Sequence, residues 1–213
     1  MTSDQIATLV APYLISAPPA TLYGQLSQYL ALLLKWNART NLTAIRDPEE
    51  IVRRHFGESL FAAQYLGPCT TLLDFGSGAG FPGLPIALLR PEIVVTLAES
   101  QNKKATFLRE VVRNLGLTTE IWAARAESMP IARSFDVVTL RAVDDMEVAL
   151  PAAMVRIKPG GQLAVLTTGN YAYAQPTGRS VPLPNSQFGA LYLEDVPRGT
   201  SLSSDDSELG TRE

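Results

Sequence analysis

The sequence predicts an α/β fold: a Rossmann-like, mostly parallel seven-stranded sheet with an N-terminal helical extension. Three observations lead to this prediction. From residue 70 onward, apolar strand-like segments alternate with helical segments, which is typical of a parallel sheet covered on both faces. The first of these segments, residues 70–75, passes directly into a glycine-dense turn and a helix. Residues 1–67 show only helical periodicity, so we expect them to form an extension that packs on the sheet domain.

Apolar residues at helical spacing predict three helices in the extension, over residues 3–15, 19–35 and 47–66. The third begins at Asp47-Pro48, where an acid caps the helix and proline occupies a position that needs no amide donor. It ends at Gly67-Pro68. The mostly polar stretch over residues 36–43 is therefore predicted to be a loop between the second and third helices.

Residues 68–198 are predicted to form the sheet domain. Parallel strands are expected at 70–75, 93–98, 119–123, 135–140 and 161–167, and an antiparallel pair near 179–183 and 188–194. Helices are expected at 84–90, 102–115 and 146–157, with Gly116 as the C-cap of the middle one. The last fifteen residues, 199–213, have too little apolar content to fold, and we expect a disordered acidic tail.

The amino-acid composition is that of a globular protein and excludes several other classes. With 213 residues, 46% hydrophobic and 18% charged, the chain has the size and balance of an ordinary globular protein with one sizeable core. No apolar run approaches the length needed to span a bilayer, and Asp4 stands where a secretory signal favours positive charge, so we expect a cytoplasmic monomer. A single cysteine, Cys69, excludes an intrachain disulfide and a thiolate metal cluster, and we expect no metal.

Charge is unevenly distributed along the chain. The net charge is −3, and the tail over residues 199–213 accounts for all of it because it carries four acids and one arginine. The cations of the remaining chain gather in two clusters: Lys35, Arg39, Arg46, Arg53 and Arg54, then Lys103, Lys104, Arg109 and Arg113. Such clusters form either a basic face for an anionic partner or simply solvated helix surfaces.

The glycine-dense turn over residues 76–83 contains two overlapping patterns. Gly78, Gly80 and Gly83 fit the G-x-G-x-x-G spacing of dinucleotide sites, whereas Asp74 with Gly76 begins D-x-G-x-G-x-G. The second pattern places its first glycine where the strand ends, and it avoids holding a carboxylate against a pyrophosphate. Asp74 then either orients the turn or meets a cationic end of the ligand. We therefore favour S-adenosylmethionine over a dinucleotide or a purely structural turn.

Two further strand ends carry candidate cofactor contacts. Glu99 follows the second strand about twenty residues beyond the glycines, where an acid accepts hydrogen bonds from both ribose hydroxyls. Ala126 and Glu127 follow the third strand, and an amide next to a carboxylate matches the acceptor and donor of the adenine edge. The alternative for both acids is an ordinary solvated side chain.

Arg141 and His55 are the remaining candidates for chemistry. Arg141 leaves the fourth strand, and a buried arginine needs either a carboxylate or the phosphate or base edge of a nucleic acid. His55 lies on the apolar face of the predicted third helix, where a histidine is either part of the core or a ligand contact.

Five short motifs stand out when they are taken together: W-N-x-x-x-N-L-T from Trp36, Arg54-His55, the turn from Asp74 to Gly83, Arg125-Ala126-Glu127 and Arg141-Ala142. This set resembles one known family, RsmG (GidB), the bacterial 16S ribosomal RNA guanine-N7 methyltransferases. The resemblance implies a class I S-adenosylmethionine-dependent methyltransferase fold and methyl transfer to N7 of a guanine.

The resemblance also implies roles for single residues. Cofactor contacts are implied at Gly76, Phe81, Glu99, Ala126, Glu127 and Arg141, beside the candidates Asp74, Gly78 and Gly80. Arg141 is the implied catalytic residue. Implied candidates for contact with 16S ribosomal RNA or the small ribosomal subunit are Asn37, Asn41, Arg46, Arg54 and His55.

The chain departs from the family pattern at Thr168, where a lysine is common, and at Leu140, where a serine is usual. Two other readings therefore stay open. One is a related methyltransferase with another RNA or small-molecule substrate. The other is a module that binds cofactor or RNA without turnover.

Overall fold

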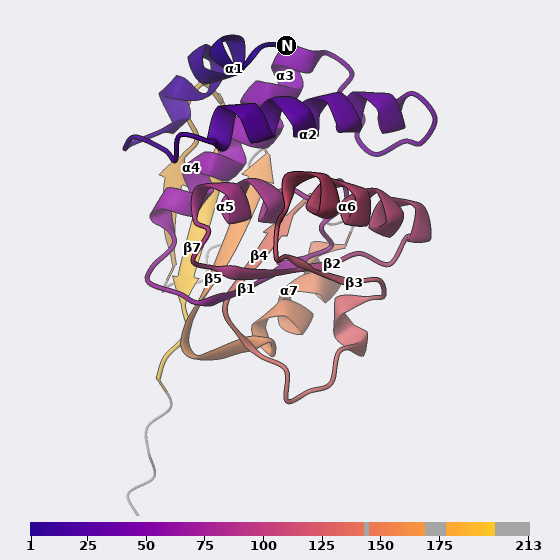
Figure 1. The fold of residues 1–213 in the computed structure, drawn as a ribbon. Coiled ribbons are helices and arrows are strands. Elements are labelled where there is room, and N and C mark those ends of the chain that lie inside the picture. The colour runs from indigo at the N-terminus through magenta and orange to yellow at the C-terminus, as the bar shows by residue number, and fades with distance from the viewer. Residues whose placement is uncertain (143–144, 169–177, 199–213) are drawn as a thin grey trace, which may run out of the picture.

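The computed structural model describes residues 1–142, 145–168 and 178–198, so the predicted disordered tail lies outside the described residues. It contains one seven-stranded sheet in the order β3-β2-β1-β4-β5-β7-β6 (Figure 1). The strands are β1 Thr71–Phe75, β2 Val94–Ala98, β3 Glu120–Trp122, β4 Phe135–Arg141, β5 Ile157–Thr168, β6 Arg179–Pro182 and β7 Gly189–Asp195. The first five run parallel, and β7 pairs antiparallel with both β5 and β6. The predicted fold class is therefore confirmed.

β5 begins four residues earlier than the sequence predicts. Phe135 pairs with Ile157, but the next pair joins Val137 to Gln162, so residues 158–161 bulge out of the ladder. These residues thus form an irregularity within the strand. Its Pro-Gly-Gly composition suits a bulge, because proline cannot donate to a ladder and Gly160 has a φ of 80°.

The helices follow the predicted pattern, with differences at several ends and in one interior. They are α1 Ser3–Val10 with the 3-10 turn η1 Ala11–Tyr13, α2 Leu22–Asn37, α3 Pro48–Glu50, η2 Ile51–Gly57, α4 Glu58–Tyr65, α5 Gly83–Leu89, α6 Asn102–Leu115, η3 Ala126–Ser128 and α7 Met146–Met154. The predicted helix over 47–66 contains a π-helical section, η2, between its α-helical ends. α7 ends at Met154, three residues before the prediction, with Pro151 inside it. Gly116 caps α6 as predicted, with a φ of 65°.

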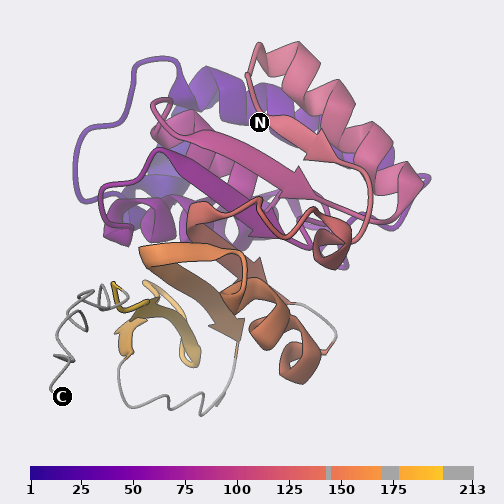
Figure 2. The ribbon, with the colours of Figure 1, turned by 90° about the horizontal axis from the view of Figure 1, so that it is seen from below.

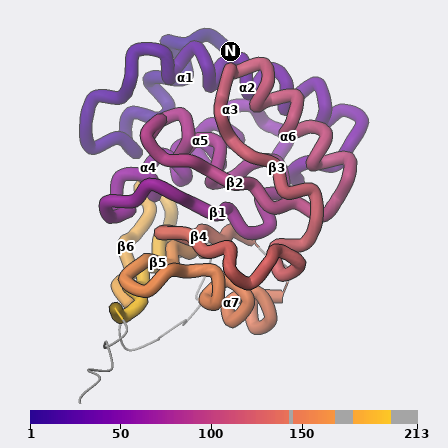
Figure 3. The backbone as a smooth tube through the Cα atoms, turned by 60° about the horizontal axis from the view of Figure 1, so that its bottom comes forward, coloured from indigo at the N-terminus to yellow at the C-terminus, as the bar shows by residue number. Residues whose placement is uncertain are grey.

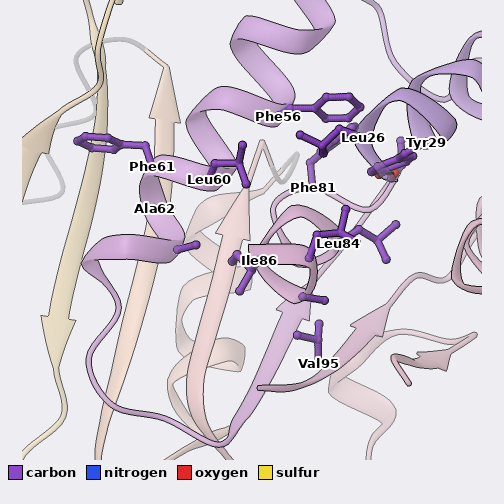
Figure 4. Packing of buried hydrophobic residues seen from close by; sticks show 14 of the residues in the cluster. Leu26, Tyr29, Phe56, Leu60, Phe61, Ala62, Phe81, Leu84, Ile86 and Val95 are labelled. Carbon is purple, nitrogen blue, oxygen red and sulfur yellow. Dashed lines mark hydrogen bonds between the residues drawn. The ribbon is translucent and has the colours of Figure 1, made fainter. Parts of the chain in front are cut away.

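Two hydrophobic clusters lie on the two faces of the sheet. α4, α5 and α6 cover one face with α1 and α2 stacked above them, and α7 with η3 covers the other face (Figures 1 and 2). In the larger cluster, Tyr29 and Phe56 from the N-terminal helices pack with Phe81, Leu84 and Val95 of the sheet domain (Figure 4). Because the extension and the sheet domain share one core, the boundary at residues 67–68 stays a prediction.

α2 lies beside α6 along the top of the molecule (Figure 3). The Trp36 ring packs against Phe107, and its Nε1 donates to Glu110 Oε2 at 3.0 Å. The N-terminal helices are thereby fixed over the edge of the sheet where the glycine turn lies. No helix in the described parts of the chain is long and apolar enough to cross a bilayer.

Candidate cofactor and substrate cleft

A cleft of about 820 Å³ opens at the carboxyl ends of β1, β2 and β4. β1 lies between β2 and β4, which is the switch point where ligands bind in open α/β sheets. The glycine turn, the end of β2, the turn after β3 and the end of β4 line it, together with residues 42–45, η2 and the start of α7. The candidates that line it are Gly76, Gly78, Phe81, Glu99, Ala126, Glu127, Arg141, Arg54 and His55.

Gly78 and Gly80 differ in what surrounds them, although both have positive φ (58° and 96°). A Cβ at Gly78 has nothing within 4 Å, so this position faces open space in the cleft. A Cβ at Gly80 would lie 2.4 Å from Leu84 Cδ1 and 2.7 Å from the Tyr29 hydroxyl oxygen. Gly78 therefore leaves room for a ligand, whereas Gly80 leaves room for Tyr29 and does not line the cleft.

Asp74 supports the glycine turn from the interior. Its side chain is 1% exposed and does not line the cleft; Oδ2 accepts from the Gly83 amide at 3.0 Å and Oδ1 from Thr139 Oγ1 at 2.9 Å. Of the two roles considered for Asp74, this geometry fits orientation of the turn and not contact with a ligand. From above, the Tyr29 hydroxyl of α2 donates to the Ala79 carbonyl. Tyr29 was not among the candidate site residues.

Glu99 joins the turn to the end of β2. Its Oε2 accepts from the Gly78 amide at 2.9 Å and its Oε1 from the Gln101 amide at 2.7 Å, and the residue is 6% exposed. Each carboxylate oxygen has two lone pairs, so each retains one for a ligand hydroxyl. Glu99 is therefore equipped both to order the turn and to hold a ribose.

The turn after β3 presents an amide and a carboxylate at the cleft. Ala126 is 3% exposed, and its amide has no acceptor among the residues that the structure describes. Glu127 is exposed and lines the cleft. With Glu99 and the open space at Gly78, these groups fit the adenosine part of S-adenosylmethionine.

Arg141 is paired with a carboxylate that the sequence analysis missed. Its Nη2 donates to Glu58 Oε2 and to the Arg54 carbonyl, both at 2.7 Å, and its Nη1 lies 3.5 Å from Ser59 Oγ. The two charged side chains are 9% and 5% exposed. Burial raises the pKa of Glu58 and lowers that of Arg141, while each charge opposes the shift of the other. The signal available in the sequence was an acid three residues after His55.

His55 forms part of the wall of the cleft. Its ring stacks on Phe81 at 4.7 Å, Nε2 lies 2.7 Å from Thr43 Oγ1, and Nδ1 is buried with no partner among the described residues. Burial, with the charges of Arg141 and Arg54, lowers its pKa to about 3. His55 is therefore a neutral imidazole at pH 7. Its ring packs against the core, and the residue also lines the cleft. The π-helical section η2 carries it and Arg54, and such sections often occur at functional sites.

Asn37 organises the loop after α2, and its contact with RNA stays a prediction. The residue is 5% exposed. Its Oδ1 accepts from the amides of Leu42 and Thr43, and its Nδ2 lies 3.2 Å from the Thr43 carbonyl and 3.5 Å from that of Ile45. The side-chain amide of Asn37 thus satisfies backbone groups of the loop.

Asn41 and Arg46 lie on the surface of the same loop, outside the lining of the cleft. Arg46 donates to Asn41 Oδ1 at 2.8 Å and to the Asn37 carbonyl at 2.7 Å. Their contact with RNA stays a prediction.

The buried Asp74 and His55 are expected to give opposite dependences of stability on pH. Burial raises the pKa of Asp74 from 3.8 to about 6, so from pH 4 to 6 the folded state keeps a proton that the unfolded state has lost, and stability falls as pH rises. The pKa of His55 falls from 6.5 to about 3, so the unfolded state holds the extra proton and stability rises with pH. The two slopes, each about 1.4 kcal/mol per pH unit, should nearly cancel in the wild type.

Single variants should separate these slopes in urea unfolding between pH 4.5 and 6. The free energy of unfolding of Asp74→Asn relative to wild type should increase with pH. That of His55→Gln relative to wild type should decrease. Differences that do not change with pH would contradict the assigned protonation states, and Glu147→Gln, at an exposed acid of α7, is the control.

Comparison with known proteins identifies close relatives. Residues 22–176 match the GidB family, described as rRNA small subunit methyltransferase G. The chain is 41% identical over 148 residues to Ribosomal RNA small subunit methyltransferase G of Xanthomonas euvesicatoria, and 43% identical over 148 residues to the protein of that name from Stenotrophomonas maltophilia. Each match covers 69% of this chain and 69% of the relative.

Solved structures share the fold at low identity. Ribosomal protein L11 methylase of Lactobacillus delbrueckii gives a TM-score of 0.55 at 11% identity, covering 68% of this chain and 79% of that one. The 16S rRNA methyltransferase RsmC of T. thermophilus, solved with AdoMet and guanosine, gives 0.54 at 18%, covering 65% and 43%. At these identities the similarity shows a shared fold.

Proposed function

Because the chain belongs to the GidB family, rRNA small subunit methyltransferase G, we propose that it transfers a methyl group from S-adenosylmethionine to N7 of a guanine in 16S ribosomal RNA. The observation that carries the proposal is the contact between Glu99 and the Gly78 amide. It places a carboxylate suited to ribose directly against a turn that leaves open space for a ligand.

Separate groups of the chain would hold separate parts of the cofactor. Glu99 would accept from the ribose hydroxyls, the Ala126 amide and the Glu127 carboxylate would meet the adenine edge, and Gly76 and Gly78 would let the backbone approach closely. When bound, S-adenosylmethionine supplies an electrophilic methyl group on a sulfonium.

Guanine N7 needs orientation more than acid or base catalysis. Its lone pair is unprotonated at neutral pH, so no residue has to remove a proton before it attacks. This matches a cleft whose histidine, His55, is neutral at pH 7. Arg141 lines the same cleft with N–H donors that its contacts with Glu58 and the Arg54 carbonyl do not occupy. We assign Arg141 the role of positioning the guanine through an acceptor such as O6.

Cations at the cleft suit an RNA backbone. Arg54, Lys104 and Arg125 line it, and Lys103 lies beside Lys104 at the start of α6. Each such cation can neutralise a phosphate, a contribution that weakens with salt. We further propose that the partner is 16S ribosomal RNA or the small ribosomal subunit, and that the protein acts in the cytoplasm as a monomer.

The test is methyl transfer by the purified chain. Radiolabelled S-adenosylmethionine is incubated with 16S ribosomal RNA and with small subunits from a strain lacking this modification, and the products are digested and analysed by mass spectrometry. We expect 7-methylguanosine at a single position. Labelling of protein, of free nucleotides or of other RNA alone would reject the ribosomal substrate. Thermal stabilisation by NAD but not by S-adenosylhomocysteine would reject the cofactor.

A further inference from the structure

Arg156 is a buried cation without a buried counter-charge. It lies between α7 and β5, is 3% exposed, and has no carboxylate partner among the residues that the structure describes. Its Nε also has no hydrogen-bond partner there. Burying an arginine in this way is costly unless its remaining donors are well used.

Those donors are used on one short turn. Arg156 Nη1 donates to the Pro130 carbonyl at 2.7 Å, and Nη2 donates to the carbonyls of Glu127 and Met129 at 3.1 and 2.8 Å. The planar fork of a guanidinium reaches several acceptors in fixed directions, which an ammonium group cannot reproduce. Arg156 therefore fixes the backbone of residues 127–130.

The same turn forms part of the cleft. Ala126 and Glu127 line it, and Met129 follows them into the hydrophobic cluster under the sheet. The Met129 amide donates to the Ala126 carbonyl at 3.1 Å. This turn lies in the crossover between β3 and β4 and forms no backbone hydrogen bonds with the strands that the structure describes. The positions of the Ala126 amide and the Glu127 carboxylate thus depend on how the turn itself is held.

An amide donor beside a carboxylate acceptor can distinguish two purines. Adenine presents an acceptor at N1 and a donor at its exocyclic amine, which match these groups. Hypoxanthine presents a donor at N1 and an acceptor at O6, so its N1–H faces the amide donor and its O6 faces the carboxylate. Each mismatch leaves a polar group unpaired, and sites built on hydrogen bonds reject such analogues strongly.

We propose that Arg156 is a positioning residue that determines cofactor specificity: by holding three carbonyl groups of the 127–130 segment, it fixes the Ala126 amide and the Glu127 carboxylate so that they select adenine over hypoxanthine. This deepens the cofactor half of the proposed function and is independent of which RNA is methylated.

The experiment measures the affinities of S-adenosylhomocysteine and S-inosylhomocysteine by titration calorimetry on the full chain. Wild type should prefer the adenine compound by about a hundredfold or more. Arg156→Lys and Arg156→Gln should lower this ratio by about tenfold or more, because the turn loses its fixed geometry. Arg133→Gln is the matched control: it removes a cation from the same crossover whose side chain pairs with Glu120, and it should keep the wild-type ratio.

Two results would overturn the proposal. One is an unchanged ratio in both Arg156 variants; the other is a loss of both affinities by the same factor, which is what a purely structural role predicts. If Arg156→Gln does not fold, Arg156→Lys retains charge and length and decides the question. As a second measurement, amide hydrogen exchange over residues 126–130 should accelerate in Arg156→Lys. Because only binding is measured, failure of RNA methylation would leave this test intact.

Discussion

Replacing Arg141 by alanine is expected to lower the rate of RNA methylation by about a hundredfold or more, and to destabilise the protein by about 3–5 kcal/mol. The two effects have different causes. The first follows from losing the group that positions the base. The second arises because Glu58, 5% exposed, loses its close partner and keeps only Arg54, whose Nε lies 4.0 Å from Glu58 Oε1. Single-turnover methylation and urea unfolding measure them separately.

The pair offers its own controls. In Arg141→Ala with Glu58→Ala, neither charge remains unpaired, so much of the lost stability should return while activity does not. Glu58→Gln alone keeps an acceptor for Arg141 and should retain measurable activity with a lowered maximal rate. S-adenosylhomocysteine affinity should stay close to wild type in Glu58→Gln, since Glu99 and the Ala126 turn are unchanged. Methylation at the wild-type rate in the alanine variant would show that Arg141 has no positioning role.

The strands and the cleft at their carboxyl ends were predictable because they depend on local pattern. An apolar run followed by Gly76 marks the end of β1, and carboxyl ends of parallel strands meet at one edge. The positions of Glu99, Ala126 and Arg141 at that edge follow directly. Nothing beyond the spacing of strands and turns was needed to bring these residues together.

Partners of buried polar groups were not predictable in the same way. Tyr29, Glu58 and Arg156 contact residues that are distant in sequence, and none of them was a candidate site residue. Their contacts depend on how α2, α4 and β5 pack, which periodicity does not define. The hydrogen bonds of Asn37 were not predictable for the opposite reason: they are local, but the loop conformation that uses them has no periodic signal in the sequence.

Glu99→Ala is expected to weaken S-adenosylhomocysteine binding by about a hundredfold. Charge-assisted hydrogen bonds to the ribose are lost, each worth about 1.5–3 kcal/mol. The amides of Gly78 and Gln101 also lose their acceptor, so the glycine turn loses one of the contacts that order it. Titration calorimetry measures the affinity, and urea unfolding shows how much of the change is stability.

Glu99→Gln tests why a carboxylate is needed and not merely a polar side chain of the same size. Both oxygens of Glu99 accept from backbone amides, so a glutamine must turn its NH₂ group toward one of those donors. The isosteric variant should therefore bind almost as weakly as Glu99→Ala. Glu92→Gln, at an exposed acid before β2, should bind like wild type. Binding by Glu99→Gln within about threefold of wild type, where a lost charge-assisted bond predicts tenfold or more, would mean that the ribose is held elsewhere.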